Sequence, residues 1–127
     1  MDADKDSLNT LSERIIGCAF TVSNTLDAGF LEKVYENALA HELRRTGLAV
    51  QQQHSIAVLY DGVTVSVYTC DLLVEGTLLV ELKATRVLDD NQSAQCLNYL
   101  KATGLQLCLL LSFGNARLQI RRLANGA

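Results

Sequence analysis

The spacing of apolar residues changes once along the chain, and this change constrains the fold more than any other feature of the sequence. Over residues 8–26 and 30–46 the apolar side chains recur at steps of three and four, which predicts two amphipathic helices. From residue 50 onwards they alternate or run together, which predicts strands. A chain of this kind is expected to pack its helices onto a sheet.

The later elements are separated by strong turn signals. Asp61-Gly62 is typical of a hairpin turn, and Gly104 ends a helix predicted over residues 91–103. Residues 105–113 form a near-continuous apolar run, which is typical of a strand buried on both faces. Because a helix precedes this strand, we expect it to lie parallel to an earlier strand. The other strands are predicted over residues 50–60, 63–74, 77–82 and 117–123.

Length and charge limit the classes of function. The 127 residues suit one domain, so residues 1–127 are expected to fold as a unit. The net charge of −3 excludes a strongly basic coat for nonspecific binding to nucleic acid, but not a nucleic acid held at one local site. The apolar runs are much shorter than the roughly 20 residues that span a bilayer, so no membrane partner is expected.

The four cysteines predict neither a zinc site nor a disulfide framework. None belongs to a C-x-x-C pair, and each lies in an apolar stretch. The first ten residues are acidic and polar, unlike a signal peptide. We therefore expect buried, reduced thiols in a cytoplasmic protein. The cysteines are Cys18, Cys70, Cys96 and Cys108.

Acidic residues occur where strands are predicted. Glu81 and Lys83 are two residues apart and point to one face, and Asp71 interrupts the preceding apolar strand although Asp is depleted in strands. A two-residue loop at residues 75–76 would put the two acids on opposite faces. A three-residue loop such as residues 74–76 would put them on the same face, and glycine at the third loop position favours this register.

Two acids on one face repel each other unless a cation or a shared proton intervenes. Mg²⁺ or Mn²⁺, held by Asp71, Glu81 and the Leu82 carbonyl, would suit metal-assisted phosphodiester hydrolysis. Lys83 would then orient the nucleophilic water or stabilise the transition state, and the sequence leaves both roles open. A structural ion pair at a strand end fits the same pattern.

Two helical patterns add candidates. Gln95 and Tyr99 lie four residues apart on one helix face and follow Lys83 across the connection, so they are expected near the acids. The amide would orient the lysine or a water, and the hydroxyl would hold a phosphate. Glu32, beside Tyr35, would be an outer carboxylate in the water shell of the metal. Each is equally compatible with a solvated polar residue or a core tyrosine.

Gly29-x-x-Glu32-x-x-Tyr35 resembles the signature of the GxxExxY family in the PD-(D/E)XK nuclease superfamily. The resemblance extends over residues 26–122 and includes the segments CDLLVEG, LLVELKA and AQCLNYLKATGL. It implies an α/β, restriction-endonuclease-like αβββαβ core, with a mixed sheet flanked by helices and an extra N-terminal helix. It also implies a Mg²⁺-dependent site.

The resemblance assigns roles residue by residue. Asp71 matches the motif aspartate, and Glu81 with Lys83 matches the E-x-K element. Glu32 matches the helical glutamate, and Gln95 with Tyr99 matches the Q-x-x-x-Y element of the exonuclease-like branch.

The sequence therefore predicts a metal-dependent deoxyribonuclease. The alternatives are an inactive nuclease-fold module that binds nucleic acid or protein, and a homo-oligomeric scaffold. A homodimer is expected, with the helix over residues 8–26 either covering the core or packing against the second copy. The candidate phosphate contacts are Arg44, Arg45, Arg86 and Lys101.

Overall fold

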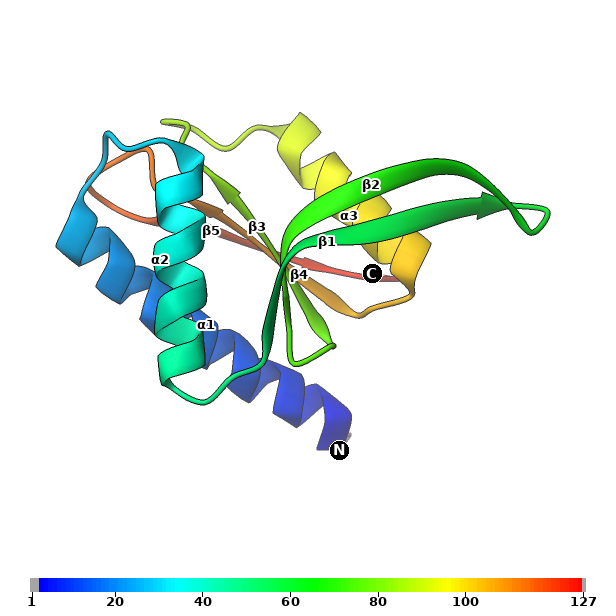
Figure 1. The fold of residues 1–127 in the computed structure, drawn as a ribbon, viewed down its shortest axis with the longest axis horizontal. Coiled ribbons are helices and arrows are strands. Elements are labelled where there is room, and N and C mark those ends of the chain that lie inside the picture. Colours follow the sequence, from blue (N-terminus) through cyan, green and yellow to red (C-terminus); the bar gives the residue numbers. More distant parts are fainter. Residues whose placement is uncertain (1–2, 127) are drawn as a thin grey trace.

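A computed structural model of the chain describes residues 3–126 and has helices on both sides of a five-stranded sheet (Figure 1). The order of the helices and strands is the one predicted from the sequence, so that prediction is confirmed. The elements are α1 (Ala3–Leu26), α2 (Glu32–Arg45), β1 (Val50–Tyr60), β2 (Val63–Val74), β3 (Leu78–Lys83), α3 (Asp90–Thr103), β4 (Leu107–Ser112) and β5 (Gln119–Ala124).

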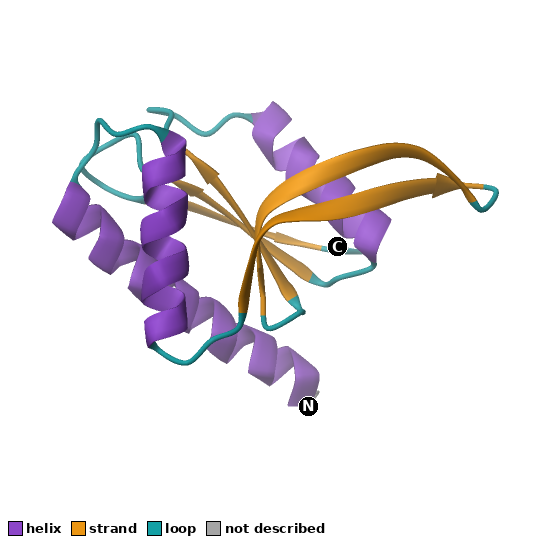
Figure 2. Cartoon of the chain, viewed as in Figure 1, coloured by secondary structure: helices purple, strands orange, loops and turns teal. Residues whose placement is uncertain are grey.

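The sheet is mixed, with strand order β1-β2-β3-β4-β5. Strands β3 and β4 are parallel, as the intervening helix predicts, and the other neighbours are antiparallel. Helices α1 and α2 cover one face and α3 covers the other (Figure 2). This is a three-layer α/β/α arrangement, in which each face of the sheet is buried under helices.

Strand β4 shows why the chain carries its longest apolar run here. All six of its residues are buried. Leu109 and Leu111 pack beneath α1 and α2, whereas Cys108 and Leu110 pack beneath α3. Since neighbouring residues point to opposite faces, a strand covered on both sides must be apolar throughout.

The N-terminal helix covers the core. Its residues Ile15, Ala19 and Val22 are buried against α2 and the sheet. From the sequence, this helix is expected either to cover the core or to pack against a second copy. In the structure it covers the core. Helix α1 begins at Ala3, five residues before the predicted start at residue 8.

Strands β1 and β2 form a long hairpin that leaves the sheet. Strand β2 pairs with β3 only over residues 72–74, and its remaining length extends past the edge of the sheet, alongside α3 (Figure 1). Gln53 of β1 lies where the hairpin leaves the sheet and has a φ of 55°. This left-handed conformation costs an L-residue about 1 kcal/mol or more, so tertiary contacts must hold it there.

All four cysteines are free thiols. Three are buried, and Cys18 is half-buried. Within residues 3–126, no helix is long and apolar enough to cross a membrane.

Candidate active site

The turn between β2 and β3 determines which side chains share a face of the sheet. Residues 75–77 separate Val74 from Leu78, which are paired across the two strands. The predicted loop length of three is confirmed, but the predicted position, residues 74–76, is one residue off. Two consecutive residues with positive φ (53° and 66°) close the turn and leave Thr77 as an extra residue before the ladder begins.

This register brings the two acids together. Asp71 and Glu81 lie just beyond the last pair of the ladder, Leu72 with Val80, and each carboxylate accepts a backbone N–H from the opposite strand. The Asp71 N–H donates to Glu81 Oε1 at 3.2 Å, and the Leu82 N–H donates to Asp71 Oδ2 at 2.8 Å. The carboxylates thus take the place of backbone acceptors where the strands separate.

Three further candidates lie beside Glu81 or beside the lysine that pairs with it. The ammonium of Lys83 lies 3.5 Å from Glu81 Oε2 and donates to the Gln95 amide oxygen at 3.4 Å. The Tyr99 hydroxyl lies 3.3 Å from Glu81 Oε2 and 3.1 Å from the Thr69 carbonyl oxygen. Helix α3 holds the amide and the hydroxyl over this end of the sheet because a capping box of Asp89 and Gln92 fixes its start.

Burial and charge alter the acidity of this cluster. Glu81 is 5% exposed, and burial, followed by the Asp71 carboxylate, raises the pKa of Glu81 from 4.5 to about 7. The Asp71 N–H and Lys83 oppose the rise only in part. Burial, and then Glu81, also raise the pKa of the Tyr99 phenol, so it stays a neutral hydrogen-bond donor. An acid pair of this kind has a strong preference for a cation.

The helical glutamate that joins the site is Glu36, which the sequence analysis missed. Its side chain is buried on α2 and forms an ion pair with Lys33 at 3.2 Å. Gln52 and Gln53 each donate to its carboxylate at 2.7 Å, and Gln53 also donates to Asp71 Oδ1 at 3.3 Å. The Gln51–Gln53 run at the start of β1 was the available signal, but a polar run at a strand entrance gives no indication of its partners.

The GxxExxY segment spans the loop before α2 and the first turns of that helix. Glu32 is exposed in the first turn of α2, and its role in the water shell of the metal stays a prediction. It lies one helical turn before Glu36 on the same face of α2. The Tyr35 hydroxyl is buried and donates to the Asp27 carbonyl at 2.6 Å while accepting the Phe30 N–H at 3.1 Å. This tyrosine therefore anchors the loop before α2.

The predicted phosphate contacts are dispersed. Arg44 donates to the side chain of Gln52 and to the Val50 carbonyl, beside the Glu36 network. Arg45 is neutralised in part by an ion pair with Glu42 at 2.8 Å. Two further cations, Arg86 in the loop after β3 and Lys101 on α3, are exposed.

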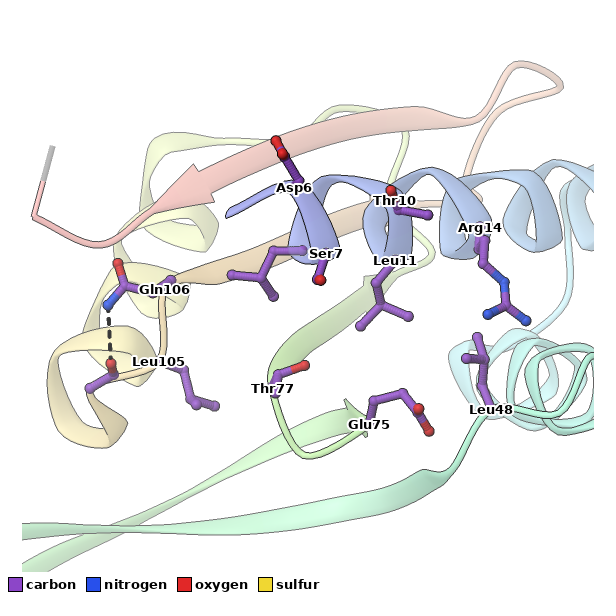
Figure 3. A pocket seen from close by; sticks show the side chains of 12 residues that line it. Asp6, Ser7, Thr10, Leu11, Arg14, Leu48, Glu75, Thr77, Leu105 and Gln106 are labelled. Atoms are coloured by element: carbon purple, nitrogen blue, oxygen red, sulfur yellow. Dashed lines mark hydrogen bonds between the residues drawn. The ribbon is translucent and has the colours of Figure 1, made fainter. Parts of the chain in front are cut away.

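One cavity lies away from the acids. It has a volume of about 770 Å³ and is formed between α1, the β2–β3 turn and the start of β4 (Figure 3). Leu11, Arg14, Leu48 and Glu75 are among the residues that line it. The acids lie at the opposite end of β3, so this cavity is not part of the cluster.

The donor set that the structure provides is small and consists of oxygen atoms. Among the described residues, no group of three or more His, Cys, Asp or Glu side chains is arranged to hold a metal. Two carboxylates with acceptor capacity remaining are the set that suits Mg²⁺, which keeps several of its waters. In an antiparallel pair the N–H and C=O of one residue point to the same side, so the Leu82 carbonyl is also directed toward Asp71.

Two acids and a lysine thus lie together on adjacent strands, between layers of helices. The sequence matches the PD-(D/E)XK nuclease superfamily over residues 9–123, and the chain therefore belongs to this superfamily. The crystal structure of an alkaline exonuclease from Laribacter hongkongensis is similar, with a TM-score of 0.55 and 18% identity. The match covers 73% of this chain and 55% of the exonuclease, so the chain spans about half the length of that protein. No curated protein sequence matches the chain.

The predicted fold class, an α/β restriction-endonuclease-like core with a mixed sheet flanked by helices, is confirmed by these comparisons.

Proposed function

We propose that this protein is a metal-dependent phosphodiesterase that hydrolyses DNA, of the GxxExxY branch of the superfamily. The observation that carries the proposal is the convergence of Asp71, Glu81 and Lys83 at one end of β3. A merely structural ion pair needs one acid for one base, whereas here a second, neighbouring carboxylate makes the cluster unfavourable without a further cation.

Asp71, Glu81 and the Leu82 carbonyl would hold Mg²⁺ or Mn²⁺. When bound, the metal makes a water more acidic and offsets negative charge on the phosphate. Lys83 presents donors beside the same carboxylates, where it can orient the attacking water or neutralise a phosphate oxygen. Gln95 holds the lysine and Tyr99 holds Glu81, so both act by positioning other groups.

Two further groups complete the proposal. Glu36 and Gln53 orient Asp71 from α2 and β1. Glu32, one helical turn before Glu36 on the same face, would reach the water shell of the metal. Arg44, Arg45, Arg86 and Lys101 are proposed to contact phosphates flanking the cleaved bond. The location expected from the free thiols is the cytoplasm.

The test is a cleavage assay with 5′-labelled DNA and RNA, in single-stranded and duplex form, in buffers with Mg²⁺, Mn²⁺ or EDTA. We expect metal-dependent cleavage of DNA, lowered roughly 100-fold or more by Asp71→Asn, which corresponds to about 3 kcal/mol. Asp61→Asn, at the exposed tip of the hairpin, is the matched control and is expected to leave cleavage unchanged.

Thermal unfolding separates the chemistry from the fold. At a hundred times its Kd, Mg²⁺ is expected to stabilise the wild type by about 2.7 kcal/mol and to have no effect on folded Asp71→Asn. Metal binding without cleavage of any substrate would favour the inactive binding module. If Asp71→Asn unfolds the chain, the aspartate has only a structural role.

A further inference from the structure

A second, shallower groove lies next to the proposed catalytic cluster, between the β1–β2 hairpin and α3. It has a volume of about 380 Å³, at the lower end of the roughly 300–1,000 Å³ of ligand pockets. Tyr68 of β2 forms one wall, and α3 forms the other. The α3 residues that line it are chiefly Asn91, Gln92, Gln95 and Asn98, with Asp89 at the start of the helix.

The chemistry of this groove suits an uncharged polar ring. Among the described residues that line it there is no lysine or arginine, and Asp89 adds a carboxylate, so a phosphate group is disfavoured there. Asn91 and Asn98 are exposed, and each amide offers donors as well as an acceptor. Asparagine and glutamine amides are the side chains that pair with the edges of bases such as adenine.

Tyr68 provides an aromatic surface. The centroid of its ring lies 5.8 Å from that of Tyr99, and the two rings make an interplanar angle of 57°. Tyr99 thus supports one side of Tyr68, and Tyr68 is half-buried. Aromatic rings held in this way are the platforms on which proteins stack single-stranded bases. A base lying against Tyr68 would have its edge toward the amides of α3.

The groove is joined to the catalytic cluster through Gln95. The side chain of Gln95 lines the groove, and its amide oxygen accepts the hydrogen bond from Lys83. A nucleotide whose phosphate lies beside Lys83 would therefore have its base directed toward the groove. On the basis of the proposed function, we infer that this groove binds the unpaired base next to the phosphate that is cleaved.

This site makes single-stranded DNA, or a frayed end, the substrate class. A base in a duplex is stacked and paired, and extracting it costs a few kcal/mol, whereas a base in a single strand is already accessible. The net charge of −3 also gives the chain little bulk attraction for a duplex.

The experiment measures binding without cleavage. A 5′-fluorescein single-stranded DNA and its blunt duplex are titrated with Asp71→Asn protein in EDTA and followed by fluorescence anisotropy. We expect the single strand to bind at least about tenfold tighter than the duplex. Adding Tyr68→Ala is expected to weaken single-strand binding about tenfold, and Tyr68→Phe to retain it. Tyr60→Ala, at the exposed hairpin tip, is the matched control and is expected to have no effect.

A helix-surface variant serves as a second probe that cannot disturb the core. Asn98→Ala removes an exposed amide and is expected to weaken single-strand binding severalfold, whereas Asn24→Ala on α1 is expected to leave it unchanged. A single abasic residue is then moved along the DNA. We expect one position at which the abasic residue weakens binding to the wild-type groove but not to Tyr68→Ala, because each change removes the same contact.

The outcomes distinguish the two proposals. If the single strand binds, but Tyr68→Ala and Asn98→Ala bind it equally well and the abasic scan is flat, the groove inference is overturned and the proposed function stands. If neither the single strand nor the duplex binds, the proposed function fails and the inference fails with it.

Discussion

The stability of the metal-free protein is expected to fall as the pH rises through the range in which Glu81 ionises. The folded protein holds a proton on Glu81 up to a pKa of about 7, whereas the unfolded chain loses it near 4.5. The folded state therefore binds more protons than the unfolded state between these values, and its free energy of unfolding decreases with pH in this window. Below the window the stabilisation is fully present, and above it the stabilisation has been lost.

The size of the effect follows from the shift. With 1.36 kcal/mol per pH unit, the difference between 4.5 and about 7 corresponds to about 3 kcal/mol. Glu81→Gln has the same shape but no charge to lose. Its free energy of unfolding, minus that of the wild type, is therefore expected to rise by about 3 kcal/mol between about pH 4.5 and pH 8.

Urea unfolding in EDTA at a series of pH values gives this difference, since titrating groups that do not contact Glu81 contribute equally to both proteins. Glu13→Gln, an exposed change on α1, should run parallel to the wild type throughout. Mg²⁺ added at the upper pH should restore part of the wild-type stability and none of that of Glu81→Gln. Parallel wild-type and Glu81→Gln curves would refute the reasoning, because Glu81 would then be neither desolvated nor repelled by Asp71.

Two further predictions concern the backbone and the assembly. Gln53→Ala and Gln53→Gly both lose the amide that bridges Glu36 and Asp71. Only alanine keeps the cost of a φ of 55°, so Gln53→Gly is expected to be more stable than Gln53→Ala by about 1 kcal/mol in urea unfolding. Equal stabilities of the two variants would show that the backbone relaxes. Static light scattering at micromolar concentration is expected to report a homodimer formed without the buried face of α1, and a monomeric mass would contradict this.

The main features of the site could be predicted from local rules. Alternation places Glu81 and Lys83 on one face whatever surrounds them, because successive strand residues point in opposite directions. A turn of three residues then brings Asp71 to the same face. This result depends on the length of the turn and not on its exact position. Gln95 follows from helical spacing, because residues four apart lie on the same side of a helix, and the structure joins it to Lys83.

The helical acid could not be predicted in the same way. Glu32 and Glu36 occupy one face of α2 a turn apart, and the sequence alone offers no means of telling which of them reaches the sheet. The choice depends on how α2 lies across β1 and on the left-handed Gln53, whose amide connects Glu36 to Asp71. These are contacts between segments distant in the chain.

The sequence by itself thus determined the order of the elements, the mixed sheet and the face shared by Asp71, Glu81 and Lys83. Periodicity and turn length depend only on residues close together in the sequence, so they do not depend on how distant segments pack. Only the tertiary structure decided the participation of Glu36 and Gln53 and the path of the hairpin beside α3, because packing between distant elements selects one arrangement from several that local preferences allow equally.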